Sequence, residues 1–423
     1  MKNIFSKNIK KNWKLSLLLI ISILNYGKNI DDVIKEYEEK SYTTKINEVN
    51  LKKYDIKDKL YKNGDWNEIS ITSSNEYTTS GVYEGVSLEN TIKYGLVYYK
   101  NGYNFTNNEF TSNKVGINKN INDFFYSNIK YNRKSNEIQK DIQKITNETK
   151  KNTEIRDLID LYKNYKNKEE EIIQGKINLN GKKKDYDILT RKYQLGTASK
   201  YDYDLAKYEY ETSQLEYDNL EKELKILGEK FIIYNVELPK NGKLDELIKI
   251  ELNKEDFYAL RLNEAENIKL NETLNSTKYE KEKFDYKYPV VSADVGYDFE
   301  KKNLVIGLGV TKTIKMYNDT LEDLKNESEK LKLEYEQKKS ELVSNVGQQM
   351  INYTTYQTDE MIKQKAVEIT KADYEIYSKK YELGTDTFSN YVEKRNNYEK
   401  AKIAYITAKN ELAAFTRKIK YYK

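Results

Sequence analysis

The chain has 423 residues, of which 73 are basic and 68 acidic, and it contains two prolines but no histidine and no cysteine. It therefore lacks an imidazole base, a thiol nucleophile and any His or Cys metal ligand, which excludes most common catalytic and metal sites. This composition predicts a protein that is not an enzyme, uses no metal or other cofactor, and is built from long helices.

The N-terminus has the pattern of a secretory signal peptide. Five lysines precede the ten-residue apolar run 15–24, after which the chain turns polar. A membrane anchor is disfavoured because a spanning helix needs about 20 apolar residues. No cysteine follows the run, which excludes a lipid-anchored N-terminus. Removal of residues 1–27 would leave 68 basic and 68 acidic groups, so charge gives no reason to expect nucleic-acid binding.

Alternating apolar and polar residues predict two β-hairpins, one in each half of the chain. Residues 85–100 form one such strand, with a less regular partner at about 67–83, and residues 291–300 and 304–313 form the other pair. We therefore expect four strands, within about residues 67–100 and 289–313. The asparagine-rich segment 101–118 is expected to be turn-like.

A soluble sheet with one wet face would show the same alternation. The signal peptide, the tyrosines near the strand ends and the scarcity of other core-forming sequence favour an outer-membrane β-barrel instead. Four strands cannot close on themselves, and open strand edges are not tolerated in lipid. The barrel is therefore expected to be built from several chains.

An internal repeat organises the rest of the chain. Residues 185–225 align with 373–413 without a gap, and 14 of the 41 pairs are identical. Both copies contain the motif Y-x-L-G-T. We interpret the mature chain, 28–423, as a single unit made of two structural repeats, about 28–235 and 236–423.

Each copy of the motif predicts a helix, a tight turn and a returning helix, with turns at 194–199 and 382–387. Gly196 and Gly384 are expected to be the left-handed residues that end the incoming helices. Ser199 and Thr387 are expected to cap the outgoing ones. Beyond each turn a tyrosine or leucine recurs every seven residues, which indicates a coiled-coil seam, and the tyrosines are expected to pack over small residues of a neighbouring helix.

These features resemble the TolC-like outer-membrane efflux proteins, also called outer membrane factors. The resemblance rests on the two Y-x-L-G-T motifs with their heptads, the strand pair that begins at Pro289, and the opening helix NIDDVIKEYEEKS. It implies a mainly α fold with a β-barrel part. In the family, four transmembrane strands per chain form a trimeric 12-stranded barrel, and a long α-helical coiled-coil tunnel crosses the periplasm.

The resemblance also implies a function. Such proteins are porin-like outer-membrane channels of tripartite efflux or type I secretion systems. They work with a periplasmic adaptor and an inner-membrane pump of the ABC or RND type, and pass drugs, toxins or proteins outward without chemistry of their own. We therefore expect a homotrimer in the outer membrane that extends into the periplasm.

Site residues follow from the same resemblance. The adaptor is expected to dock at the tips of the two helix turns, which comprise Leu195, Gly196, Thr197, Leu383, Gly384 and Thr385. The periplasmic gate is expected at Asp202, Asn390, Glu393, Tyr381 and Asp386. Asn390 replaces an acid, and Asp386 stands where some family members have a basic residue that locks the closed tip. Asp202 and Glu393 have an alternative interpretation as solvated heptad residues paired with Lys207 and Lys394.

Two other functions are compatible with parts of the sequence. A periplasmic adaptor also has a signal peptide and a coiled-coil hairpin, but it is expected to have one hairpin flanked by compact β domains. This sequence shows two equivalent helix turns and amphipathic strands. The remaining alternative is a purely structural periplasmic coiled coil, which would lack membrane strands.

Overall fold

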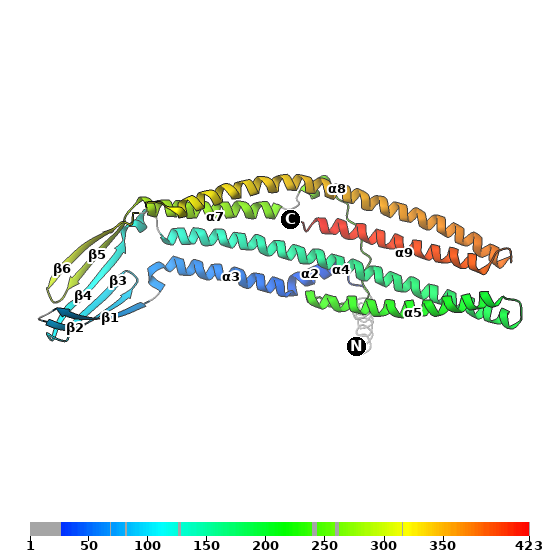
Figure 1. Ribbon diagram of the computed structural model, residues 1–423, viewed down its shortest axis with the longest axis horizontal. Helices are drawn as coiled ribbons and strands as arrows, with labels where there is room; N and C mark the ends of the chain where they lie inside the picture. Colours follow the sequence, from blue (N-terminus) through cyan, green and yellow to red (C-terminus); the bar gives the residue numbers. More distant parts are fainter. Residues whose placement is uncertain are drawn as a thin grey trace, which may run out of the picture. The chain divides into compact units, whose positions relative to one another are not determined.

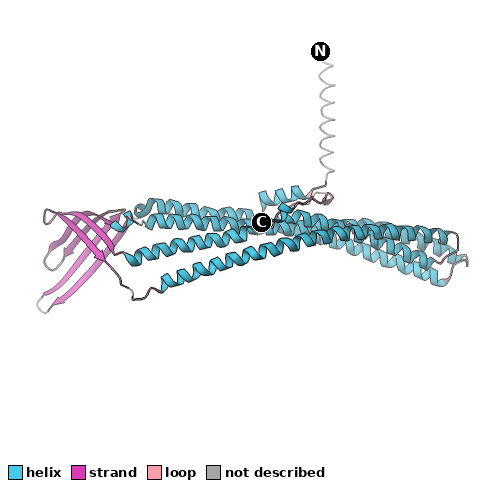
Figure 2. Ribbon diagram, turned by 90° about the horizontal axis from the view of Figure 1, so that it is seen from above, coloured by secondary structure: helices cyan, strands magenta, loops and turns pink. Residues whose placement is uncertain are grey.

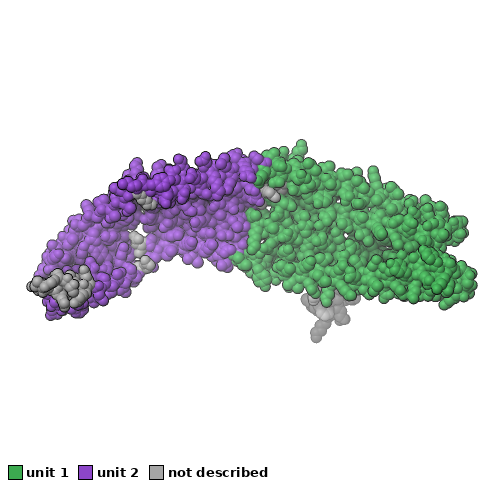
Figure 3. Space-filling view, viewed as in Figure 1, with its two compact units in different colours: residues 1–46, 149–262, 341–423 green, residues 47–148, 263–340 purple. Residues whose placement is uncertain are grey.

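The computed structural model describes residues 27–67, 69–80, 83–125, 128–238, 243–258, 262–314 and 316–422. The predicted signal peptide lies outside the described residues except for Gly27. The chain folds into two compact units (Figure 3). Unit 1 comprises residues 1–46, 149–262 and 341–423, and unit 2 comprises 47–148 and 263–340. Each unit contains segments of both predicted repeats.

Long helices dominate the fold (Figures 1 and 2). α4 has 67 residues and α8 has 64. No helix in the described ranges has the length and apolarity needed to cross a membrane. The helices are α2 (Ile30–Lys40), α3 (Tyr42–Asn63), α4 (Asn128–Gln194), α5 (Lys200–Lys230), α6 (Lys254–Tyr258), α7 (Leu262–Lys287), α8 (Asp319–Glu382) and α9 (Phe388–Ile419), with short 3₁₀ turns η1 (Gly64–Asn67), η2 (Ile121–Phe124) and η3 (Phe231–Tyr234).

Unit 2 contains one antiparallel sheet in which the strands lie side by side in chain order (Figure 1). Its strands are β1 (Ile69–Ser80), β2 (Tyr83–Tyr94), β3 (Val97–Asn104), β4 (Glu109–Asn120), β5 (Val290–Asp298) and β6 (Asn303–Thr311). The sheet thus has six strands where the sequence predicted four. The two additional strands come from the first half of the chain.

The prediction of a single strand over residues 85–100 is wrong, because the chain reverses direction in the middle of this segment. Gly95 has φ +59°, and residues 95 and 96 form a two-residue turn that pairs Tyr94 with Val97. A side chain at position 95 would overlap the ring of Trp66. Glycine is therefore required there both for the backbone conformation and for the packing.

The predicted turn-like segment 101–118 is also largely strand. Its turn is confined to residues 105–108. The Asn104 side chain accepts hydrogen bonds from the backbone N–H groups of Thr106 and Asn107, at 2.9 and 3.1 Å, and Asn108 has φ 54°. Asparagine thus has its usual turn role at one place only, and the flanking residues pair with each other as β3 and β4.

One face of the sheet is apolar and exposed. Two rows of side chains, formed by direct cross-strand neighbours, each contain one residue from every strand. All twelve side chains are more than one-third exposed in the single chain. We call them the two apolar rows: Ile69, Tyr94, Val97, Ile117, Val295 and Ile306 in the first, and Ile71, Ile92, Tyr99, Val115, Tyr297 and Leu304 in the second.

The opposite face of the sheet is polar. Asp294 accepts hydrogen bonds from the Tyr98 hydroxyl at 2.9 Å and from the Lys114 ammonium at 2.6 Å. Gly116 makes room for this group, because a β-carbon there would lie 2.7 Å from the Tyr98 hydroxyl oxygen. The sheet therefore has the two-faced character that the alternating pattern indicates.

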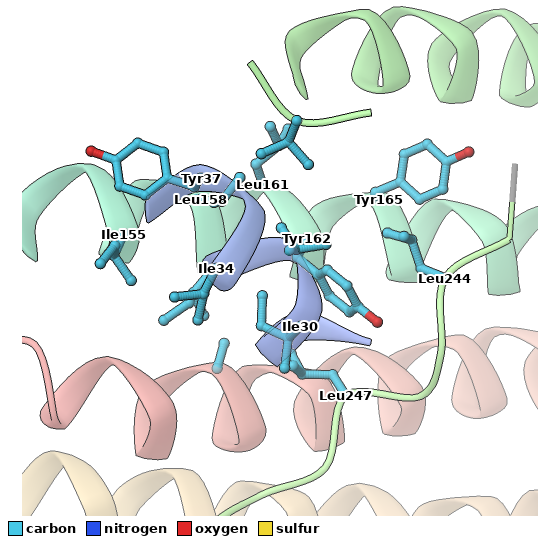
Figure 4. Close-up of a cluster of buried hydrophobic side chains, with 14 of the residues drawn as sticks. Ile30, Ile34, Tyr37, Ile155, Leu158, Leu161, Tyr162, Tyr165, Leu244 and Leu247 are labelled. Carbon is cyan, nitrogen blue, oxygen red and sulfur yellow. The ribbon is translucent and has the colours of Figure 1, made fainter. Parts of the chain in front are cut away.

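The main hydrophobic core lies in unit 1, where α2 packs against α4 (Figure 4). α2 begins at the Asn29 cap and buries Ile30, Val33, Ile34 and Tyr37, which are the helical spacing of one apolar face. These side chains meet residues of α4 that include Tyr162. The Tyr162 hydroxyl lies 2.7 Å from the Asp245 carbonyl oxygen, which holds segment 243–253 against the same core.

Candidate functional site

The two helix turns in unit 1 have the same backbone geometry. The N–H groups of Gly196 and Thr197 donate to the carbonyls of Tyr193 and Lys192, at 3.0 and 2.8 Å. The equivalent bonds at Gly384 and Thr385 measure 3.0 and 2.9 Å. This is the Schellman pattern, in which a left-handed residue follows the helix. Gly196 and Gly384 have φ +73° and +71°, which confirms the role predicted for both glycines.

Both outgoing helices carry the predicted caps. The Ser199 hydroxyl accepts from the N–H of Asp202 at 3.0 Å, and the Thr387 hydroxyl accepts from the N–H of Asn390 at 3.2 Å. The acids differ between the turns. In the first, the Asp202 carboxylate accepts from the Ser199 hydroxyl at 2.8 Å. In the second, Asp386 accepts from the Asn390 side chain at 2.7 Å, and this bond lowers the pKa of the Asp386 carboxyl.

The six residues predicted for docking are all exposed. Leu195 and Leu383 are 77% and 78% exposed, and no atom lies within 4 Å of a β-carbon placed on Gly196 or Gly384. Each turn therefore presents an apolar side chain beside bare backbone, which suits recognition by another protein rather than catalysis. In the described part of the chain no group of three or more acidic side chains is arranged to hold a metal ion.

A small apolar cluster joins the two turns. Leu189 of α4, Ala206 of α5 and Phe388 and Val392 of α9 are buried together, and Tyr381 of α8 packs against them. Burial raises the pKa of the Tyr381 hydroxyl. We call this set the tip cluster. Tyr381, predicted as a gate residue, has a packing role in the single chain.

The other predicted gate residues lie on different elements: Asp202 is in the first turn of α5, Asn390 and Glu393 are on α9, and Asp386 is in the turn before α9. Glu393 is exposed and lies 3.5 Å from the Lys394 ammonium, as the alternative interpretation expected. Lys207 pairs with Glu211 at 3.9 Å. A ring of acids is therefore not formed within one chain and would require symmetry-related copies.

Within each repeat, tyrosines of the incoming helix stack on tyrosines of the returning one. The rings of Tyr186 and Tyr210 lie 5.7 Å apart, and those of Tyr374 and Tyr398 lie 5.8 Å apart. The stacks comprise Tyr186, Tyr193, Tyr203 and Tyr210 in the first repeat and Tyr374, Tyr381, Tyr391 and Tyr398 in the second. The stacking itself was not predicted, and it arises because the facing helix also has tyrosines seven residues apart. Tyr186, Tyr381 and Tyr391 also pack against the cluster that contains the small residue Ala206.

Between the repeats, α4 and α9 are joined by polar side chains. The pairs run antiparallel along both helices, and we call them the α4–α9 polar seam. They are Asp160 with Lys418 at 2.9 Å, Lys163 with Glu411 at 2.8 Å, Asn167 with Asn410 at 2.6 Å, Gln174 with Lys402 at 2.8 Å, and Asp185 with Arg395. The sequence did not predict this seam.

In the pair nearest the turns, Arg395 is buried and Asp185 is partly buried. The Arg395 side chain is 8% exposed and donates to the Asp185 carboxylate. Its Nε and Nη2 atoms have no acceptor among the described residues. Burial raises the pKa of Asp185, and the charge of Arg395 opposes that shift. Asp185 recurs in the second repeat as Asp373, but Arg395 aligns with Lys207, so the repeat alone gave no signal for this pair.

We expect Gly384→Ala to destabilise the second turn, because a β-carbon at φ +71° costs about 1–2 kcal/mol. Gly347→Ala is the matched control, since Gly347 lies inside α8 with nothing within 4 Å of its β-carbon. That change should add stability, by about 0.8–1 kcal/mol. Amide hydrogen exchange at residues 380–390 measures the difference. Equal exchange in the two variants would contradict the assigned geometry.

We expect Arg395→Met to destabilise unit 1 by about 3–5 kcal/mol, because it leaves the partly buried Asp185 carboxylate unpaired. The double change with Asp185→Leu should recover most of that loss. The melting temperature followed by circular dichroism measures both effects.

Melting temperatures measured over a range of pH distinguish the cost of the unpaired Asp185 carboxylate from a simple loss of packing. In Arg395→Met the folded-state pKa of Asp185 is expected to lie above the unfolded value. The stability of this variant should therefore rise as pH falls through the folded-state pKa, whereas the double variant should show no such rise. A single variant that melts like the wild-type protein at every pH would refute a structural role for the pair.

No family model matches the sequence, and no curated protein matches it. Solved structures match the fold over most of the chain. The outer membrane channel CmeC of Campylobacter jejuni is 13% identical, with a TM-score of 0.72, and the match covers 93% of this chain and 85% of that one. The outer-membrane channel OprN is 12% identical, with a TM-score of 0.71 and coverages of 93% and 91%.

The outer membrane protein VceC of Vibrio cholerae is 11% identical, with a TM-score of 0.68, and the match covers 92% of this chain and 96% of that one. Similarity at this level of identity establishes the fold. The predicted fold class, long helices with a β part, is therefore confirmed. The chain has the fold of these outer-membrane proteins.

Proposed function

We propose that the protein is an outer-membrane channel that works as a homotrimer and exports cargo without catalysing a reaction. The observation that carries this proposal is the sheet in unit 2. Its two apolar rows expose twelve large side chains on one face, and its other face is polar. A β-barrel in the outer membrane has this arrangement, with the apolar side in lipid and the polar side in water.

The lengths of five strands agree with a position in the membrane. β5 and β6 have nine residues each and β1, β2 and β4 have 12, whereas β3 has eight. A transmembrane strand needs about 9–11 residues. Aromatic side chains also gather where the strands join the helices, as expected at a lipid interface. Phe124, Phe125 and Tyr288 are exposed there.

Exposed heptads in unit 1 support association with further copies of the chain. Ile362, Ile369 and Ile376 of α8 and Leu383, which directly follows this helix, are spaced seven residues apart, and each is at least half exposed. Tyr201, Tyr208 and Leu215 repeat this pattern on α5. A seven-residue apolar stripe is the seam by which one helix packs against another. The stripes have no partner within the described chain, so we assign them to the interfaces of the trimer.

The helix turns would then be the docking site for a periplasmic adaptor. Both turns present an exposed leucine beside a glycine, and the tip cluster holds them together. An adaptor and an inner-membrane pump, of ABC or RND type, would complete a tripartite efflux or type I secretion system for drugs, toxins or proteins. Two equivalent turns in each of three chains would offer the adaptor a ring of similar sites.

We assign the gate to Asp202, Asn390 and Glu393, with Tyr381 and Asp386 as supporting residues. Asp202 and Asn390 lie in the first turn of α5 and α9, and Glu393 is three residues further along α9. In a threefold assembly each acid is present three times. Like charges repel at short range, which favours bound cations at such a ring.

The rival function, a periplasmic adaptor, is less well supported. All the named strands of the described residues belong to one sheet, and there is no compact β domain beside a single hairpin. Fractionation tests the proposal directly. We expect the protein to stay with outer membranes after salt and carbonate washing, because its apolar rows would lie in lipid. Release of folded protein by the wash would support the adaptor or a soluble coiled coil.

We expect the double change Ile369→Gln with Ile376→Gln to weaken the trimer. Burying one isoleucine against a partner contributes about 1.5–3 kcal/mol, so the trimeric fraction near the dissociation midpoint should fall at least tenfold. Lys371→Gln with Glu375→Gln is the control, because that exposed ion pair lies on another side of α8. The mass of the detergent-extracted particle is the measurement. An unchanged mass in the isoleucine variant would remove these residues from the interface.

We expect the isolated channel in a planar bilayer to conduct poorly, to prefer cations and to be blocked by divalent or trivalent cations added on the periplasmic side. Asp202→Asn with Glu393→Gln should abolish the block without changing the trimer. Asp204→Asn with Glu382→Gln makes the same charge change at nearby exposed acids and should leave the block intact. If the block persists in the first variant, the constriction lies elsewhere.

A further inference from the structure

The sheet has two free edges, on β1 and on β6. Every strand between them is paired on both sides. Among the described residues neither β1 nor β6 has a second strand partner. In hydrocarbon each unpaired backbone N–H or C=O group costs several kcal/mol, so a strand in the membrane needs neighbours on both edges.

The apolar rows show how many strands face the same environment. Both rows continue through β1 and β2 without interruption, with Ile69 and Tyr94 in the first row and Ile71 and Ile92 in the second. Ile69 and Ile71 are 64% and 72% exposed, much like Leu304 and Ile306 of β6 at 63% and 68%. Beyond the second row the next outward residue of β1 is polar, and it begins a polar cross-strand row made of Ser73, Asn90, Asn101 and Asn113. The apolar rows thus end at the same level on β1 and β2 as on β3 and β4, which supports placing all six strands in one environment.

The pairing of β2 with β3 decides which edges can meet. β3 has eight residues, and all of them pair with β2, from Val97 with Tyr94 to Asn104 with Ser87. β4 occupies the other side of β3. A wall of four strands per chain would need β3 at its edge, and this would require β2 to be displaced. The six-stranded sheet therefore leaves β1 as the edge that can pair with β6 of another copy.

We infer that β1 of one copy pairs with β6 of the next copy, so that each chain contributes six strands to the membrane wall. The inference rests on the proposed trimeric channel. Successive strands are antiparallel, so β1 and β6 run in opposite directions, and β6 of one copy meets β1 of the next as an antiparallel pair. Three copies of six strands give a wall of 18 strands, in place of the 12 that the sequence predicted. Barrels of about 16–18 strands leave a water-filled channel.

Disulfide cross-linking tests this pairing, and the absence of native cysteine makes the chain suitable for it. Ile69→Cys or Ile71→Cys is combined in turn with Leu304→Cys, Ile306→Cys, Leu308→Cys or Val310→Cys. All these positions lie on the apolar face, and directly opposed residues of antiparallel strands have β-carbons about 4.5–5.5 Å apart. The panel covers the outward positions of β6 at any register within the strand. Val305→Cys, on the opposite face, is the negative control.

A second panel tests closure by four strands per chain. In it Val97→Cys or Tyr99→Cys of β3 is combined with the same β6 positions. After oxidation in native membranes, we expect covalent dimers and trimers from at least one β1 pair, and at least tenfold less product from every β3 pair.

The outcomes distinguish failure of the six-strand wall from failure of the proposed channel. Trimers in the membrane that cross-link through β3, or through neither panel, would overturn the six-strand wall and leave the channel proposal intact. Folded monomers in the membrane, with no cross-linking, would overturn both. Cross-linking from Val305→Cys at the level of its neighbours would show that the strands are not held in this register, and this would also reject the inference.

Discussion

Backbone hydrogen bonding at the edges of the sheet is the constraint on which the rest of the structure depends. The apolar rows make one face of the sheet suitable for lipid, and lipid tolerates no unpaired edge. A single chain cannot satisfy this requirement, because its sheet is open at β1 and β6. The exposed stripes on α5 and α8 are then surfaces that association would bury. Features of both units thus support the proposed association with further copies.

Two different kinds of contact hold unit 1 together. Within each repeat, the returning helix is attached by stacked tyrosines, which bury large apolar surfaces and keep the hydroxyl groups near water. Between the repeats, the α4–α9 polar seam uses hydrogen bonds and ion pairs. Polar pairs of this kind contribute little net stability but fix the register of two helices.

At the tip, the contacts within each hairpin differ in kind from the polar contacts between the two hairpins. Each hairpin of two helices, with its Schellman turn and cap, is held by stacked tyrosines next to the turn. The seam between the hairpins can exchange its hydrogen bonds for water at lower cost. A rearrangement that separated the hairpins at the tip would also have to expose the tip cluster, which joins them by apolar packing. The pair of Arg395 and Asp185 lies where that separation would cost most.

The sequence predicted the features that depend on local residues. The left-handed glycines, the caps at Ser199 and Thr387 and the β5–β6 hairpin follow from short motifs, and the structure contains all of them. The turn at Gly95 was missed because apolar residues continue to alternate through it, at Tyr94, Leu96 and Tyr98. A two-residue turn reverses the chain without interrupting that alternation, and Tyr98 then lies on the polar face.

Long-range pairings could not be predicted from the same motifs. The contacts of the α4–α9 polar seam join residues more than 200 positions apart, and single lysines and acids on a charged helix look alike in sequence. The sequence did contain a signal for the tyrosine stacks, since Tyr186 and Tyr193 on α4 have the same spacing as the tyrosines they meet on α5. The gate was assigned by resemblance alone, because its residues would meet only in the trimer.

Electron cryo-microscopy of the protein in lipid nanodiscs would test the central claim most directly. The account predicts three copies around one axis, with the sheets joined edge to edge into a closed wall inside the lipid disc and with the apolar rows facing the lipid. A particle in which the sheet lies outside the disc, or in which the edges of β1 and β6 remain open within the lipid, would contradict it.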